Sequence, residues 1–162
     1  MATYTVDPLS RRLVQTYSGL YAYQHVAVSH TGDLVETTFA SFTIPGGTLG
    51  ANGTLKINAL VTCNSNANSK TVRVYFGGQQ IGILTMTTLG GLVFERRLVN
   101  KNSESAQVIY AAQLSTSFGN TSATYSEYTV DTTQDQTLTI TGQLAVGTDN
   151  ITCRSVDVEV LR

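Results

Sequence analysis

The sequence is short of the residue types that build charged binding surfaces. Charged residues make up 13% of the 162 residues, against roughly 25% in an average soluble domain. The formal net charge of -1 gives no long-range field that would concentrate phosphates, so no nucleic-acid partner is expected. The two adjacent basic pairs, Arg11-Arg12 and Arg96-Arg97, are explained more simply as solvated or ion-paired residues than as phosphate clamps.

Long apolar runs are also missing. No stretch of about 18 apolar residues is present, so no transmembrane segment is expected. The N-terminal residues 1–8 have neither a basic start nor an apolar stretch of signal-peptide length. We therefore expect a protein that is made in a cytoplasm, is not exported by a signal and has no membrane partner.

Histidine is too scarce to support nucleophilic catalysis. Only His25 and His30 are present, and no serine lies in a Gly-x-Ser-x-Gly elbow. We expect His25 to be a structural histidine within a strand, and His30 to stand at a turn before Gly32. No catalytic residue is assigned, and the protein is not expected to be an enzyme.

The carboxylates show no catalytic or metal-binding spacing. Asp131 and Asp135 flank a short loop, where Asp side chains commonly close turns on their own backbone, and this is favoured over a glycosidase pair. The same two residues, with Asp149, lack the Asp-x-Asp-x-Asp spacing of a calcium loop. Glu36 and Glu127 have no identifiable partner. No metal and no cofactor are therefore expected.

Cysteine occurs twice, at Cys63 and Cys153, both in strand-like surroundings. Two thiols cannot make a zinc site alone, and reduced cysteine behaves as a small buried hydrophobe. Free thiols are favoured, with a disulfide as the alternative.

What the sequence does contain is the pattern of a β-protein. Turn-forming clusters of glycine, asparagine and serine divide the sequence at Pro45–Gly53, Asn64–Ser69 and Gly77–Gly78. The short segments between them alternate polar and apolar residues with a period of two. About ten such segments predict an all-β fold, an antiparallel β-sandwich of the jelly-roll kind. The expected strands are Tyr21–Ser29, Val35–Ile44, Thr54–Cys63, Thr71–Phe76, Gln79–Thr85, Leu92–Asn100, Ala106–Leu114, Thr124–Val130, Gln136–Gln143 and Ile151–Leu161.

Alternation assigns the faces of two of these strands. In the last strand Val156, Val158 and Val160 are expected to face the core. In Val35–Ile44 the aromatics Phe39 and Phe42 fall on opposite faces, which predicts a strand covered on both sides.

Residues 1–20 lie outside the sheet pattern and are predicted to be separate from a sandwich domain over 21–162. They fit a short helix capped by Asp7 and ended by Gly19, or an extended arm that contacts a neighbouring chain. The residues expected to make assembly contacts are the tyrosines and arginines of residues 1–20 and the two tyrosines that follow: Tyr4, Arg11, Arg12, Tyr17, Tyr21 and Tyr23.

Two patches of sequence carry a family resemblance. The first runs from Ile44-Pro45 through Gly47-Thr48-Leu49-Gly50 and Asn52-Gly53 to Lys70-Thr71-Val72-Arg73-Val74 and Gly77-Gly78. The second comprises Val130-Asp131-Thr132-Thr133, Asp135-Gln136-Thr137-Leu138-Thr139 and Gly142-Gln143-Leu144. Over Ser29 to Leu161 the chain resembles a β-rich domain of tailed-phage and prophage virion proteins, of the capsid decoration or head or tail fibre type.

The resemblance implies a non-enzymatic virion protein, expected as a homotrimer. The favoured role is a decoration or cement protein that binds the major capsid protein or other virion proteins and stabilises the head. The alternative is a tail-fibre or head-fibre domain that recognises a host surface glycan. Tryptophan, the commonest platform for a sugar ring, is absent, and four of the eight tyrosines precede residue 24, so assembly is favoured.

Overall fold

The computed structural model describes residues 2–6, 13–17, 19–110 and 125–162, and all regular structure in these ranges is β. Arg11 and Arg12 therefore lie outside the described residues. The described part of the chain contains no helix that is long and apolar enough to cross a membrane.

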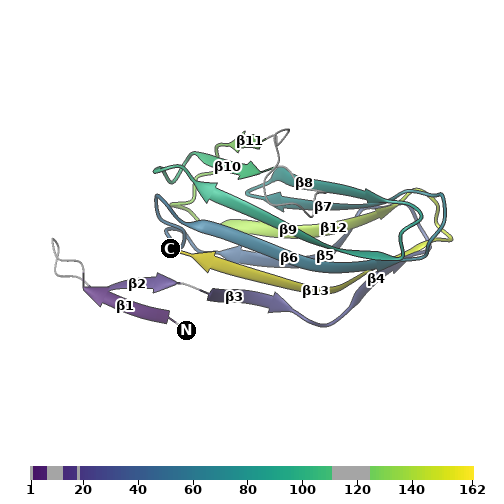
Figure 1. The fold of residues 1–162 in the computed structure, drawn as a ribbon, viewed down its shortest axis with the longest axis horizontal. Coiled ribbons are helices and arrows are strands. Elements are labelled where there is room, and N and C mark those ends of the chain that lie inside the picture. The colour runs from purple at the N-terminus through teal and green to yellow at the C-terminus, as the bar shows by residue number, and fades with distance from the viewer. Residues whose placement is uncertain (1, 7–12, 18, 111–124) are drawn as a thin grey trace, which may run out of the picture.

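The strands form two sheets that face each other and one separate hairpin (Figure 1). The large sheet has seven strands in the order β11-β10-β9-β6-β13-β3, with β4 also paired to β13, and the small sheet has four in the order β5-β12-β7-β8. All pairings are antiparallel. The strand bounds are β1 Ala2–Val6, β2 Leu13–Tyr17, β3 Gly19–Gln24, β4 Val28–Thr31, β5 Thr37–Ile44, β6 Thr54–Cys63, β7 Lys70–Phe76, β8 Gln79–Met86, β9 Gly91–Asn100, β10 Gln107–Tyr110, β11 Tyr125–Tyr128, β12 Gln136–Leu144 and β13 Asn150–Leu161.

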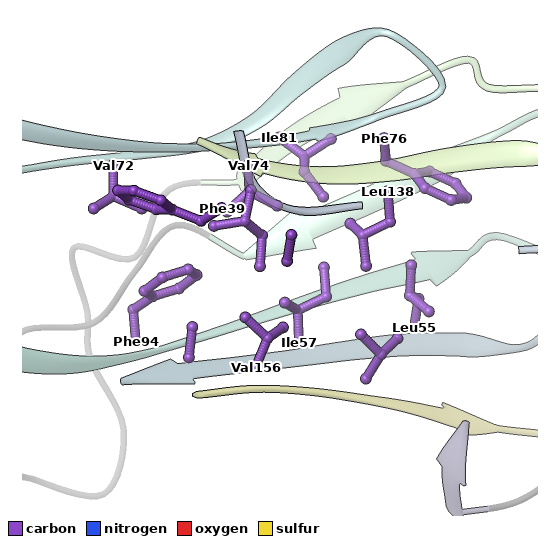
Figure 2. Packing of buried hydrophobic residues seen from close by; sticks show 14 of the residues in the cluster. Phe39, Leu55, Ile57, Val72, Val74, Phe76, Ile81, Phe94, Leu138 and Val156 are labelled. Carbon is purple, nitrogen blue, oxygen red and sulfur yellow. The ribbon is translucent and has the colours of Figure 1, made fainter. Parts of the chain in front are cut away.

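The core lies between the sheets and is made by alternate residues of each strand. Figure 2 shows Leu55, Ile57 and Val156 of the large sheet facing Val74 and Leu138 of the small sheet. Each fully buried aliphatic side chain of this kind contributes roughly 1.5–3 kcal/mol relative to exposure. The predicted inward row on the last strand is confirmed, since Val156, Val158 and Val160 are all buried.

The predicted all-β sandwich is confirmed, and the expected strand Thr54–Cys63 matches β6 at both ends. The expected strand Tyr21–Ser29 is wrong as one piece, because β3 and β4 pair with successive parts of β13. The pairing of β13 with β6 shifts register between Cys153 and Ser155. This irregularity separates the part of β13 that pairs with β4 from the part that pairs with β3.

This break reverses the expected settings of the two histidines. His25 lies in the connection after β3 with its side chain 55% exposed, not inside a strand. His30 lies within β4 and is 6% exposed, not at a turn.

A β-bulge in β5 overturns the prediction that this strand is covered on both sides. Ala40 pairs with Ile140 and Thr38 with Thr141, so Phe39 is the extra residue. The bulge turns Phe39 to the core side, and Phe42 packs against the same core. A Cβ on Gly142 would lie 2.2 Å from the Phe39 ring, so the ring occupies the space that a side chain at this position would need.

The N-terminal segment forms a hairpin of β1 and β2, with Tyr4 opposite Gln15 and Tyr17 opposite Ala2. The helical alternative is wrong, because Leu13–Tyr17 is a strand and Gly19 begins β3. The extended arm remains, and Figure 1 shows this hairpin beyond the end of the sandwich at which β3 begins. The boundary after residue 20 stays a prediction.

Candidate functional site

The outer face of the small sheet carries cross-strand rows of polar side chains. One row runs Ser41, Thr139, Tyr75, Gln80 from β5 to β8. The next runs Thr38, Thr141, Arg73 and ends on the exposed apolar Ile83 of β8. A third adds Gln143, Thr71 and Thr85. Because successive residues of a strand alternate between its faces, the threonines that flank the core positions fill this outer face with hydroxyl groups.

A single carboxylate organises the centre of this face. Glu36, just before β5, accepts hydrogen bonds from Arg73 Nη1 at 3.1 Å, Tyr75 Oη at 3.0 Å and Thr141 Oγ1 at 2.5 Å. Arg73 Nη1 also donates to Gln143 Oε1 at 2.9 Å, and Gln143 Nε2 donates to the Leu34 carbonyl at 3.1 Å. We call Glu36, Arg73, Tyr75, Thr141 and Gln143 the Glu36 platform.

The platform is fixed yet open to solvent. The side chains of Glu36 and Arg73 remain 32% and 20% exposed. Desolvation, together with the hydrogen bond to Glu36 and the negative charge of Glu36, raises the pKa of Tyr75 above its ordinary value of 10.0. Tyr75 therefore stays a neutral donor at physiological pH, and the Glu36 and Arg73 charges balance within the site.

The outer face of the large sheet is built differently. Lys56 Nζ lies 3.3 Å from Glu159 Oε1 and 3.9 Å from Glu95 Oε2, and Arg97 Nε lies 2.7 Å from Glu95 Oε1. Leu60 and Val93, paired across β6 and β9, are 38% and 71% exposed. This face therefore combines paired charges with uncovered apolar side chains.

A third polar group is buried where the β6–β7 and β12–β13 connections meet. Asp149 Oδ1 accepts from Asn64 Nδ2 at 2.7 Å and from Asn66 Nδ2 at 2.6 Å. Lys70 is fully buried, with its Nζ donating to Asn66 Oδ1 and to the Asn68 carbonyl and lying 3.9 Å from Asp149 Oδ2. The amide donors hold the pKa of Asp149 below its ordinary value of 3.8, and the arrangement ties the two connections together.

Of the carboxylate pair singled out from the sequence, Asp131 closes the predicted turn on its own backbone, whereas Asp135 binds a backbone group far along the chain. Asp131 Oδ1 accepts from the Thr133 backbone N–H at 3.0 Å, which closes an Asx turn, and from Thr133 Oγ1 at 2.6 Å. Asp135 Oδ1 accepts from the Gly46 backbone N–H at 2.9 Å. Among the described residues no group of three histidine, cysteine, aspartate or glutamate side chains is placed to hold a metal ion.

Each histidine has a side-chain partner, and the two cysteines are not joined to each other. His25 Nε2 lies 2.8 Å from Asp157 Oδ1, and His30 Nδ1 lies 3.1 Å from Thr37 Oγ1. Cys63 and Cys153 are free thiols, and burial raises the pKa of Cys63 and takes that of Cys153 to about 11. Thiolates, the reactive form, are therefore disfavoured at neutral pH.

The described residues among those expected to make assembly contacts lie in two places, the β1–β2 hairpin and strand β3. Tyr4 and Tyr17 lie in the β1–β2 hairpin, whereas Tyr21 packs against the sandwich core and donates to the Thr43 carbonyl at 3.4 Å. Tyr23 is 62% exposed on the large sheet opposite Asp157, with its ring centroid 4.8 Å from that of His25. Their part in assembly stays a prediction.

Most of the Glu36 platform was not predicted from the sequence. Glu36 stood out as a carboxylate without a partner. Arg73 and Gln143 fell within the two patches of family resemblance, which gave them no role in a site, and Tyr75 and Thr141 lay in no motif. The one available signal was the alternation within Thr71–Phe76 and Gln136–Gln143, which places these residues opposite the core positions.

No protein-family model matches this chain, and no curated protein matches it in sequence. Solved structures with a similar fold include carbohydrate-binding modules and a lectin. The CBM36-1 domain of a multidomain xylanase from the hindgut metagenome of Trinervitermes trinervoides is 15% identical, with a TM-score of 0.43 over 80% of this chain and 74% of that one.

Two further structures are a phage module and a lectin. The CBM2 module of the evolved Dit of Lactobacillus casei BL23 phage J-1 is 9% identical, with a TM-score of 0.45 over 90% of this chain and 97% of that one. Lectin II from Ulex europaeus is 7% identical, with a TM-score of 0.39 over 86% and 94%. At this level of similarity, function has to be argued from the residues of this chain.

Proposed function

We propose that this protein is a non-enzymatic carbohydrate-binding module that binds a neutral glycan on the outer face of its small sheet. The observation that carries the proposal is the convergence of three donors on Glu36, in a face that otherwise presents mainly threonine hydroxyl and glutamine amide groups. A sugar presents hydroxyls that both donate and accept, and such a ligand needs side chains already held in place on a rigid sheet.

The platform has unused capacity for such a ligand. A carboxylate has about four lone-pair sites and a guanidinium five donors, so Glu36 and Arg73 keep free positions beyond their mutual contact. Because their charges cancel within the site, a neutral glycan fits better than a charged one. The Tyr75 ring offers an apolar surface beside them, in the absence of tryptophan.

The test is binding to an array of neutral and acidic glycans, followed by calorimetry on any ligand found. We expect Glu36→Ala and Gln143→Ala to weaken binding by about tenfold or more, because each removes groups that orient the ligand. Glu159→Ala on the opposite face is the matched control and should bind as the wild type does. A ligand that binds equally well to Glu36→Ala, or an array that captures only acidic glycans, would contradict this assignment.

A virion decoration role is the second candidate, favoured by the β1–β2 hairpin that extends past the sandwich and by the uncovered apolar residues of the large sheet. In a homotrimer that covers a shell, the hairpin and these apolar residues would contact neighbouring protein chains. Deleting residues 1–18, ahead of β3, should leave a folded sandwich that no longer binds particles. Copy number in purified virions separates a decoration protein from a glycan-binding domain carried by a fibre, since a shell protein is far more abundant than a fibre.

A further inference from the structure

Lys70 is a fully buried lysine at the first position of β7. It lies on the inward row that continues with Val72 and Val74, and it pairs with the buried residues Leu144 of β12 and Met86 of β8. A charged group in such a place needs polar partners close by. The connections β6–β7 and β12–β13, which lie at the same end of the sandwich (Figure 1), supply them.

The side-chain amide of Asn66 lies directly against the Lys70 amine. Lys70 Nζ donates to Asn66 Oδ1, and the Asn68 backbone N–H donates to the same oxygen at 3.0 Å. Hydrogen-bond donors on an amide oxygen stabilise the negative charge that develops there when a nucleophile attacks the amide carbon. The Asn68 N–H would remain in place for this role after Lys70 has given up its proton.

Asp149 lies between the nitrogens of these two groups. Its Oδ1 accepts from Asn66 Nδ2 at 2.6 Å, and its Oδ2 lies 3.9 Å from Lys70 Nζ. Asp149 is 2% exposed, and its Oδ2 has no hydrogen-bond partner among the described residues. Because amide donors hold the pKa of Asp149 below its ordinary value, the carboxylate is ionised and can accept a proton from the amine.

We infer that Lys70 and Asn66 form an intramolecular amide bond with release of ammonia, and that Asp149 carries the protons. Asp149 Oδ2 takes a proton from Lys70 Nζ, the nitrogen lone pair forms a bond to Asn66 Cγ, and the bond from Cγ to Nδ2 breaks as Asp149 protonates Nδ2. The lysine nitrogen gives up two protons in all. Both leave with Nδ2 as an ammonium ion, so atoms and charge balance and no oxidant or reductant is needed.

The surroundings favour this reaction even though amides are unreactive in water. Holding an amine and a carbonyl carbon in one rigid site replaces a rare encounter by a permanent one, and a site shielded from water protects the intermediate from hydrolysis. The low pKa of Asp149 makes it a weak base, so we expect the bond to form slowly after folding. That is sufficient, because each molecule reacts once. This modification is independent of the Glu36 platform and of glycan binding.

The experiment uses the full chain, kept folded for several days and then denatured for mass spectrometry. We expect an intact mass that is lower than that of the sequence by one ammonia. Trypsin should not cut after Lys70 once its amine is acylated, so residues 57–73 should appear as one light peptide whose fragments link Asn66 to Lys70. Cyclisation of Asn52 onto the Gly53 nitrogen would also release ammonia, but it falls in a different tryptic peptide.

Lys70→Met removes the amine and should restore the full mass. Lys56→Met is the matched control, since Lys56 also lies beside a carboxylate, that of Glu159, and this variant should still lose ammonia. Asp149→Asn removes the base and should slow the loss by about 100-fold or more, leaving the chain at full mass when the wild type has reacted.

Should Lys70→Met or Asp149→Asn not fold, the fragment spectrum of the wild-type peptide decides alone. A wild-type chain that stays at full mass, or an ammonia loss that maps outside residues 57–73, would overturn the inference. So would an equal loss in folded Lys70→Met or an unchanged rate in folded Asp149→Asn.

Discussion

The two outer faces of the sandwich use the same pleated geometry for opposite arrangements of charge. On the small sheet, Arg73, Tyr75 and Thr141 converge on Glu36. On the large sheet, charges are spread along rows, as in Glu159, Lys56, Arg97. Lys56 pairs across the strands with Glu159 and Glu95, and Arg97 pairs with Glu95 of its own strand.

The two faces therefore differ in how their polar groups are arranged: on the small sheet they surround one carboxylate, and on the large sheet they form separate pairs. Groups that converge on one carboxylate fix each other's rotamers, which is what a ligand-binding surface needs. Exposed cross-strand pairs each contribute about 0.2–1 kcal/mol and give solubility and register more than a site. The small sheet is therefore the better candidate for recognition, and the apolar residues of the large sheet for contact with another protein.

The largest expected effect on this comparison comes from Gly142→Ala. The new methyl group would collide with the Phe39 ring, whose bulge lies just after Glu36, so overpacking should cost about 1–3 kcal/mol and disturb the platform. Urea unfolding measures the loss. Gly90→Ala, where no atom lies within 4 Å of the added carbon, is the control and should stay close to wild type. Equal stability of the two variants would show that the bulge does not hold the platform in place.

Next in size is the loss of the central carboxylate. Glu36→Ala should lower the free energy of unfolding by about 1–2 kcal/mol, because Arg73, Tyr75 and Thr141 lose a charged acceptor that is only partly exposed. Glu159→Ala on the other face should cost under about 1 kcal/mol, as is usual for surface pairs. Similar losses from both variants, in matched denaturation curves, would erase the distinction between the faces.

The titration of Tyr75 gives a pH-dependent test. Its folded-state pKa is raised above 10.0, so its contribution to stability is complete below that value and is lost as pH rises through the folded pKa. Removing the Glu36 charge with Glu36→Gln should bring the pKa of Tyr75 down, whereas Glu95→Gln on the opposite face should not. Tyrosine ring-carbon NMR shifts, assigned with Tyr75→Phe, report the titration. An unchanged Tyr75 pKa in Glu36→Gln would contradict the role given to the carboxylate.

The smallest effect concerns salt. Lys56→Gln should cost roughly 0.2–1 kcal/mol at low ionic strength and nearly nothing at about 1 M salt, where exposed charges are screened within about 3 Å. Denaturation in the two buffers measures this, with Thr85→Ala as a neutral control on the small sheet. A cost that persists in high salt would mean that Lys56 acts through the packing of its aliphatic stem.

Several strands could be predicted from the sequence, because period-two alternation and turn residues depend only on a few neighbouring positions. Thr54–Cys63 was placed to the residue, and Val156, Val158 and Val160 were correctly turned inward. The pattern failed where register slips. The bulge at Phe39 moved an aromatic to the other face, and the break opposite Arg154 exchanged the settings of His25 and His30.

The sequence by itself determined an all-β chain with a large core, little charge and turns at Pro45–Gly53 and Asn64–Ser69, because these depend on composition and on neighbouring residues. Only the tertiary structure decided which polar residues meet. Glu36, Arg73 and Thr141 come from three segments far apart in the chain, brought together by the strand order β5-β12-β7. From the sequence, Arg96 was interpreted with Arg97 as solvated or ion-paired. The fold instead buries Arg96 beside Gly82, which has no side chain to clash with it. Strand order and register are set by the packing of the whole core, which no local window of sequence contains.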